Sequence, residues 1–225
     1  MYNISSLSKT QSANNNNEVN NSVEIFSDAN VKHNFYSTLS FWTNKANSCN
    51  ISTTVHLIGK RHGFGVINVE HHTDMLKNAL SFLKELGKTN GKILFVNDQF
   101  TNNLDGIVKT FAVNSGQPYS IEKWNCGKLT MAEAKLQYKA VIILNPTKNL
   151  FLIREARKLG IPIISLCAGE SAIFNVTYPI ICNNESGDSI LYILLTFANA
   201  IIYGQLQQVY TNWSSQKEAL ITDEK

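Results

Sequence analysis

The sequence predicts an α/β fold, in which a parallel central sheet carries helices on both faces. Ala140 to Leu144 and Ile161 to Leu166 are short apolar runs without polar alternation, as in strands buried on both faces. Apolar residues recur at helical spacing between the two runs. Gly160 and Pro162 then end that helix. Two buried strands joined by a helix need a right-handed crossover, so they are parallel neighbours.

The remaining segments continue the alternation of strands and helices along the chain. The further strands are expected at Val55 to Ile58, Phe64 to Val69, Lys92 to Val96, Tyr119 to Ile121 and Thr177 to Ile181. Helices are expected after Thr73 as N-cap, around Leu104 to Phe111, and from Ser189 to Gln207. This order indicates a flavodoxin-like arrangement of one α/β domain.

Composition divides the chain into three parts. Residues 1–50 form an Asn-rich extension that we expect to be partly disordered or docked on a partner through its aromatic residues; a flexible tail is the alternative. Residues 51–209 form the α/β domain, and 210–225 a polar C-terminal tail. The apolar run Ser189 to Tyr203 is shorter than the ~20 residues that span a bilayer, so we expect a buried helix and no membrane partner.

The charge is compatible with nucleic-acid binding but does not require it. The formal net charge is +3 and the pI is about 8.6. The four cysteines are widely spaced and have no metal-ligand spacing, which favours unpaired thiols in a reducing compartment. His56, His62, His71 and His72 straddle a strand and a turn, so they are expected to point to different faces and to bind no metal.

Four segments together resemble one known family. They are GKRHGFGVINVE (Gly59 to Glu70), GKILFV (Gly91 to Val96), KWNCGKLT (Lys123 to Thr130) and LNPTKNLFLIREARKLGIPIISL (Leu144 to Leu166). Their order and spacing resemble the small-subunit ribosomal protein S2 family, most closely its mitochondrial and organellar members. The agreement extends from about Asn50 to Ile202.

The resemblance implies a structural, non-catalytic constituent of the small ribosomal subunit that binds small-subunit ribosomal RNA and neighbouring ribosomal proteins. It implies no cofactor, metal or small-molecule substrate, and a mitochondrial location in preference to a plastid. The chain departs from the family pattern at Cys49 to Thr53 and at Asn97 to Gln99, where cations are lost, and at Ala168 to Glu170. The family's long helical hairpin between Thr130 and Ala140 is shortened or absent. Protein contacts are therefore expected to replace part of the RNA contacts.

The RNA-binding candidates fall into two groups. Lys60, Arg61 and His62 lie in a turn bordered by glycines, where a phosphate can approach closely. Lys123 and Lys128 flank Trp124, and the ring could stack on a base or could pack in the core, which is the preferred interpretation. The alternative for each cation is an ordinary solvated surface charge.

A different class of protein is also possible. The segment Ser165 to Ser171 follows a strand at the carboxyl edge of the sheet, where flavodoxin-like or sugar-phosphate-binding enzymes bind ligands. No histidine base or carboxylate partner accompanies these serines, so no catalytic residue is expected.

Overall fold

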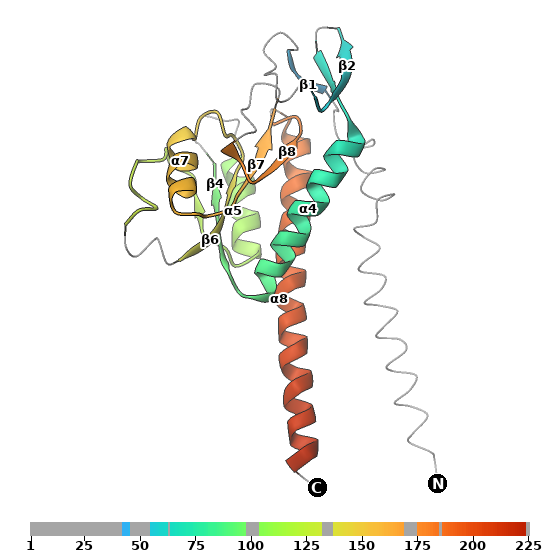
Figure 1. The fold of residues 1–225 in the computed structure, drawn as a ribbon, viewed down its shortest axis with the longest axis vertical. Coiled ribbons are helices and arrows are strands. Elements are labelled where there is room, and N and C mark those ends of the chain that lie inside the picture. Colours follow the sequence, from blue (N-terminus) through green and yellow to red (C-terminus); the bar gives the residue numbers. More distant parts are fainter. Residues whose placement is uncertain are drawn as a thin grey trace, which may run out of the picture.

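The computed structural model describes residues 42–45, 55–62, 64–97, 104–131, 137–168, 175–184 and 186–223. The elements are β1 (Trp42–Lys45), β2 (Leu57–Arg61), β3 (Phe64–Ile67), α4 (Val69–Lys88), β4 (Lys92–Val96), α5 (Asp105–Asn114), β5 (Tyr119–Ser120), β6 (Tyr138–Ile143), α7 (Leu150–Lys158), β7 (Ile163–Cys167), β8 (Tyr178–Ile181) and α8 (Gly187–Asp223). Figure 1 shows their arrangement.

The main sheet is parallel and has the order β5-β4-β6-β7-β8. When its strands alone are counted in chain order, this is 2-1-3-4-5, the flavodoxin-like order. The expected α/β fold is therefore confirmed. A second, antiparallel sheet has the order β1-β3-β2, and β1 comes from the segment that we expected to be an extension.

The predicted strand–helix–strand unit is present as β6, α7 and β7. Val141 of β6 lies opposite Ile163 of β7 in parallel register. The helix ends at Lys158, and Gly160 follows its C-cap with a φ of +69°, the left-handed conformation that favours glycine. The Gly160 N–H donates to the Arg157 carbonyl at 3.1 Å and the Ile161 N–H to the Ala156 carbonyl at 2.9 Å, which is a Schellman motif.

The helices cover both faces of the sheet. On one face α4, α5 and α8 pack on alternate strand residues such as Phe95 and Ile142. On the other face α7 packs on Leu94, Val141 and Ile143. Side chains of one strand therefore alternate between two cores, which is why the strands read as unbroken apolar runs.

The backbones of α4 and α8 touch where the two helices cross. A Cβ at position 204 would lie 2.2 Å from the carbonyl oxygen of Lys84 and 3.0 Å from the Cα of Gly87. A Cβ at position 87 would lie 2.5 Å from the carbonyl oxygen of Ile201. Glycine is therefore required on both helices for this close approach.

Beyond Gly204, α8 extends past the rest of the domain (Figure 1). We expected this helix to end near Gln207, but it continues to Asp223. By length and composition, its stretch Gly187–Lys217 is apolar enough to cross a membrane. Half of the apolar window is buried inside the domain, as is usual for a core helix, so this is weak evidence for a span.

The entry into α4 also differs from the expectation. The helix begins at Val69, and Asn68 is its N-cap, with its side-chain oxygen accepting from the Glu70 N–H at 3.0 Å. Thr73, the expected cap, is buried within the helix, and its hydroxyl donates to the Glu70 carbonyl at 2.8 Å.

Candidate nucleic-acid interface

The first group of candidate RNA-binding residues lies on the β2–β3 hairpin. β2 continues through Arg61, so Lys60 and Arg61 are strand residues, and not turn residues as expected. Lys60 pairs with Gly65 and Arg61 with Phe64. Successive strand residues point to opposite faces, so the two cations offer charge on both sides of the hairpin. Lys60, Arg61 and His62 are all exposed, and His62 lies in the turn with a φ of +50°.

The base of the hairpin is anchored to the main sheet. Ile67 of β3 packs on Cys167 and Ile181, the last residues of β7 and β8. One turn into α4, the His72 Nδ1–H donates to the Ile181 carbonyl at 2.7 Å. Burial lowers the pKa of His72 to about 4, so the ring is neutral at physiological pH. These contacts fix the direction in which the hairpin leaves the domain.

Two of the four clustered histidines meet, which the sequence did not predict. His56 precedes β2, and its Nδ1 lies 3.3 Å from the Nδ1 of His71 on α4. Burial, and then the neighbouring His71, lower the pKa of His56. His72, next in sequence, points into the core. Within the described part of the chain, no three potential ligands gather to hold a metal ion.

The second candidate group lies on the loop between β5 and β6, and α7 holds that loop in place. The Gly127 N–H donates to the Glu155 carboxylate, which also accepts from the Leu129 N–H at 3.4 Å. Gly127 has a φ of +96°, which only glycine adopts without strain. Leu129 is fully buried, so the loop is fixed by both packing and hydrogen bonds.

Trp124 packs in the core between this loop and α7. Its side chain is 9% exposed and belongs to the cluster of Leu129, Leu152 and Ile153. This supports the packing interpretation, because a buried ring has no free face on which a base can stack. Lys128 lies over the ring, with its Nζ 5.7 Å from the centroid and 3.7 Å from the Glu122 carboxylate.

The structure adds cations that we did not select from the sequence. Arg154, Arg157 and Lys158 of α7 are exposed on the side opposite its buried residues. The hydrogen bonds of Glu155 join this helix to the loop that carries exposed Lys123. The helical spacing of the three cations could have indicated this surface from the sequence. Their link to the loop could not, because it depends on contacts between residues that are distant in sequence.

The two groups lie on different sides of the domain. The hairpin projects from the ends of β7 and β8, whereas the loop of Lys123 and Lys128 packs on α7 (Figure 1). The structure thus offers two separate basic surfaces. We call them the hairpin surface (Lys60, Arg61, His62) and the α7 surface (Lys123, Lys128, Arg154, Arg157, Lys158).

The segment Ser165 to Ser171 was the candidate for an enzyme site, and the side chains of its described residues serve the packing of the fold. Ser165 is buried in β7, and its hydroxyl donates to the Ile143 carbonyl at 2.9 Å. Burial raises the pKa of the Cys167 thiol to about 12, which keeps it protonated and unreactive. Residues 169–171 lie outside the described residues. At the switch point of the sheet, after β4, the Asn97 amide donates to the Asp105 carboxylate at 2.7 Å, and a carboxylate there disfavours phosphate.

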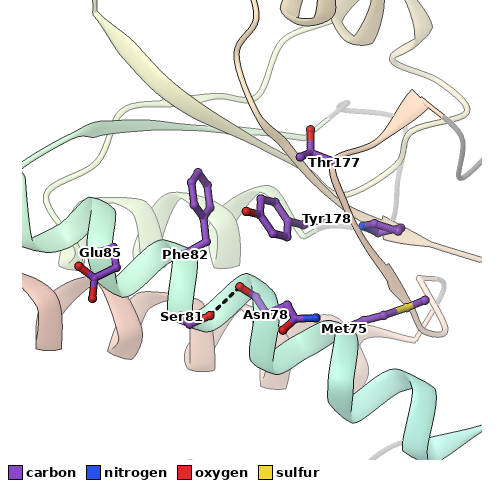
Figure 2. Close-up of a pocket in the computed structure, with 8 residues that line it drawn as sticks. Met75, Asn78, Ser81, Phe82, Glu85, Thr177 and Tyr178 are labelled. Carbon is purple, nitrogen blue, oxygen red and sulfur yellow. Dashed lines mark hydrogen bonds between the residues drawn. The ribbon is translucent and has the colours of Figure 1, made fainter.

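A pocket of about 580 Å³ lies elsewhere, between α4 and the edge strand β8 (Figure 2). Phe82 and Tyr178 stack in it with their centroids 4.8 Å apart. Its charged lining residue is Glu85, and no cation among the described residues lines it. This composition does not suit a sugar phosphate.

Together, the fold and these surfaces define a class: a structural α/β protein whose exposed cations lie on a hairpin and on one helix–loop unit. The family model described as "Ribosomal protein S2" matches residues 39–138 and 131–204. The chain belongs to the ribosomal protein S2 family, and it is a structural, non-enzymatic ribosomal protein. The two matched segments meet at 131–138, where the family's helical hairpin was expected to be shortened or absent.

Individual relatives agree with this assignment. The small ribosomal subunit protein uS2 of Psychrobacter sp. (strain PRwf-1) is 25% identical over 213 residues, covering 73% of this chain and 78% of the relative. The protein uS2 of Thermus thermophilus is 24% identical over 195 residues, covering 65% and 75%. The small ribosomal subunit protein uS2m of Schizosaccharomyces pombe is 27% identical over 161 residues, covering 60% of each chain.

Proposed function

We propose that this protein is a structural component of the small subunit of the mitochondrial ribosome and that it binds small-subunit ribosomal RNA and neighbouring proteins there. The main support for this proposal is the match to the S2 family over the whole α/β domain. The similarity to uS2m of Schizosaccharomyces pombe supports the mitochondrial assignment. The scarcity of arginine beside abundant asparagine, isoleucine and lysine agrees with an AT-rich organellar coding bias.

The hairpin surface is the proposed main RNA contact. Lys60 and Arg61 are exposed on opposite faces of β2, an edge strand of the three-stranded sheet β1-β3-β2, so phosphates can be reached from either side. Each phosphate that is neutralised steepens the salt dependence of binding, by roughly 0.9 in log–log slope on a duplex and 0.7 on a single strand. Such contacts orient a protein on RNA without reading its sequence.

The α7 surface is the proposed second contact. Its five cations lie on a helix and a loop that Glu155 ties together, so they form a pre-organised group. Trp124 acts here as the anchor of the loop, and not as a stacking platform. Lys128 is partly engaged by Glu122 and contributes less than Lys123.

Sedimentation of mitochondrial extracts on a sucrose gradient tests the assembly. The protein should migrate with small subunits and with small-subunit ribosomal RNA. If it stays at the top of the gradient with free proteins, the proposed function is wrong.

Crosslinking to RNA tests the surfaces. Ultraviolet irradiation of subunits with Lys60→Ala/Arg61→Ala should yield several-fold less crosslinked RNA than wild type. The matched control is Lys109→Ala/Lys148→Ala, which removes the same charge from exposed positions outside both surfaces. Equal losses for the two variants would point to net charge alone and would remove the assignment of the hairpin surface.

A further inference from the structure

The part of α8 beyond Gly204 carries an exposed apolar stripe. Leu206, Val209, Tyr210 and Trp213 are 57–64% exposed. At 3.6 residues per turn they fall within an arc of about 100°, the width of an apolar helix face that packs on something. Tyr210 and Trp213 are ring neighbours at 6.3 Å, and Lys217 lies over Trp213. The stripe is therefore continuous. We call it the α8 stripe.

The α8 stripe is not a continuation of the domain core. Ile201 and Gly204 face α4, and the residues two turns after them are Gln208 and Thr211, which are polar. Ser215 follows Gln208 by another two turns and is exposed. The apolar side of the free part of the helix is therefore the side that faces away from α4, where Leu191 and Leu195 are also exposed within the domain. A helix that contacted only solvent beyond the domain would carry polar residues on the side facing away from α4 as well.

The charge pattern of α8 decides between classes of partner. The helix has no lysine, arginine or histidine between Gly187 and Lys217. Affinity for RNA rests mainly on cations that neutralise phosphates, so this segment is poorly suited to RNA. Helices that lie on a membrane surface carry lysines and arginines on their polar face, and here that face is glutamine, threonine, asparagine and serine.

A second copy of the chain is a weaker fit. Leu191 and Leu195 are exposed on the same side of the helix as the α8 stripe. Exposed Asn199 lies between them and the stripe and interrupts the apolar seam that a coiled coil sustains over about three to four heptads. Burying four large apolar side chains would remove roughly 500 Å² of surface, which is more than half of one side of a standard protein interface. An apolar groove on a different protein accommodates such a helix through anchors at i, i+3, i+4 and i+7.

We propose that the α8 stripe docks into an apolar groove on a neighbouring protein of the small ribosomal subunit. This inference rests on the proposed function. The stripe lies beyond residue 204, where the match to the S2 family ends, so this contact is an addition to the part of the chain that the family shares. It supplies a protein contact from a surface separate from both basic surfaces.

Photo-crosslinking from the helix tests the partner. Full-length protein with benzoylphenylalanine in place of Val209 is assembled into small subunits, recovered from a gradient and irradiated. The expected product is an adduct with another protein that survives nuclease and is destroyed by protease. The same probe in place of Thr211, on the polar side, should give at least fivefold less adduct.

Several results would overturn the inference: a nuclease-sensitive adduct, a lipid adduct, an adduct with the mass of two copies, equal yields from both positions, or no adduct in subunit-bound protein. Because assembly is read first on the gradient, a chain that never enters subunits refutes the proposed function. A chain that enters subunits with one of those five results refutes the α8 contact alone.

A pair of variants provides an independent test. Leu206→Gln/Tyr210→Gln/Trp213→Gln removes the stripe, and Thr211→Ala/Asn212→Ala/Ser215→Ala changes as many residues on the other side. Circular dichroism should show that both keep the helix. The first variant should lower the crosslinked partner, probed from position 209, at least fivefold and the second should leave it unchanged. Equal recovery with both variants would contradict the docking.

Discussion

The crossing of α4 and α8 allows a quantitative prediction for Gly204→Ala. The added Cβ would meet three backbone atoms: the Lys84 oxygen at 2.2 Å, the Gly87 Cα at 3.0 Å and the Lys88 nitrogen at 3.0 Å. Backbone atoms of a helix cannot rotate away as a side chain can, so the two helices must separate. Overpacking of a core typically costs about 1–3 kcal/mol, and this geometry belongs at the upper end.

An opposing effect reduces the net change. Alanine is favoured over glycine in a helix interior by about 1 kcal/mol. The free energy of unfolding of Gly204→Ala should therefore fall by about 2 kcal/mol. Gly106→Ala on α5 is the matched control, because its Cβ would meet nothing within 4 Å. That variant should be as stable as wild type or more stable by up to about 1 kcal/mol.

Urea unfolding followed by circular dichroism measures both variants. The midpoint should move to lower urea for Gly204→Ala at an unchanged slope, and should stay or rise for Gly106→Ala. If Gly204→Ala unfolds at the midpoint of wild type or above it, the direct contact of the two backbones does not exist as described.

Three further predictions concern pH, salt and the α7 loop. Between about pH 6.5 and 4 the unfolded chain binds a proton at His72 that the fold excludes, so stability should fall with falling pH by about 3 kcal/mol over this window. His72→Gln should flatten that part of the urea-midpoint profile, and an unchanged profile would assign the slope to other groups. For binding of the free protein to an RNA duplex, Lys60→Ala/Arg61→Ala should reduce the log–log salt slope by roughly 1.8, against no change if neither residue reaches a phosphate. Glu155→Gln weakens two hydrogen bonds to a carboxylate and should cost about 1–2 kcal/mol, with faster hydrogen exchange at Gly127 and Leu129; full protection of those amides would contradict the anchoring role.

The strand–helix–strand unit was predictable because its signals are local. Apolar runs gave β6 and β7, and Gly160 occupies the left-handed position expected of it. The start of α4 was not predictable in the same way. Its first turn contains Glu70, His71 and His72, a polar run that hides the helical period. His72 is buried, and its hydrogen-bond acceptor is the carbonyl of Ile181, far along the chain.

The end of α8 and the two surfaces depended on contacts that the sequence does not display. Between Tyr210 and Lys217 the positions on its domain side are polar (Thr211, Asn212 and Ser215), so the segment resembles a polar tail, and Trp213 lies on the other side. Arg61 was expected in a turn because the glycines on either side suggested one, yet pairing with Phe64 extends β2 through it. Arg157 of α7 and Lys123 of the loop belong to one surface because Glu155 joins the helix to the loop.

The glycine contact between α4 and α8 also fixes the distance between the β2–β3 hairpin and the free part of α8. The β2–β3 ribbon is continuous with the start of α4, and the free half of α8 leaves from beside the end of α4 (Figure 1). At 1.5 Å per residue, α4 is ~30 Å long and the free half of α8 is a little under ~30 Å. Because their backbones are in direct contact, α4 and α8 form one rigid unit. A molecule bound to the β2–β3 hairpin and a molecule bound to the free part of α8 are therefore held at a fixed distance from each other.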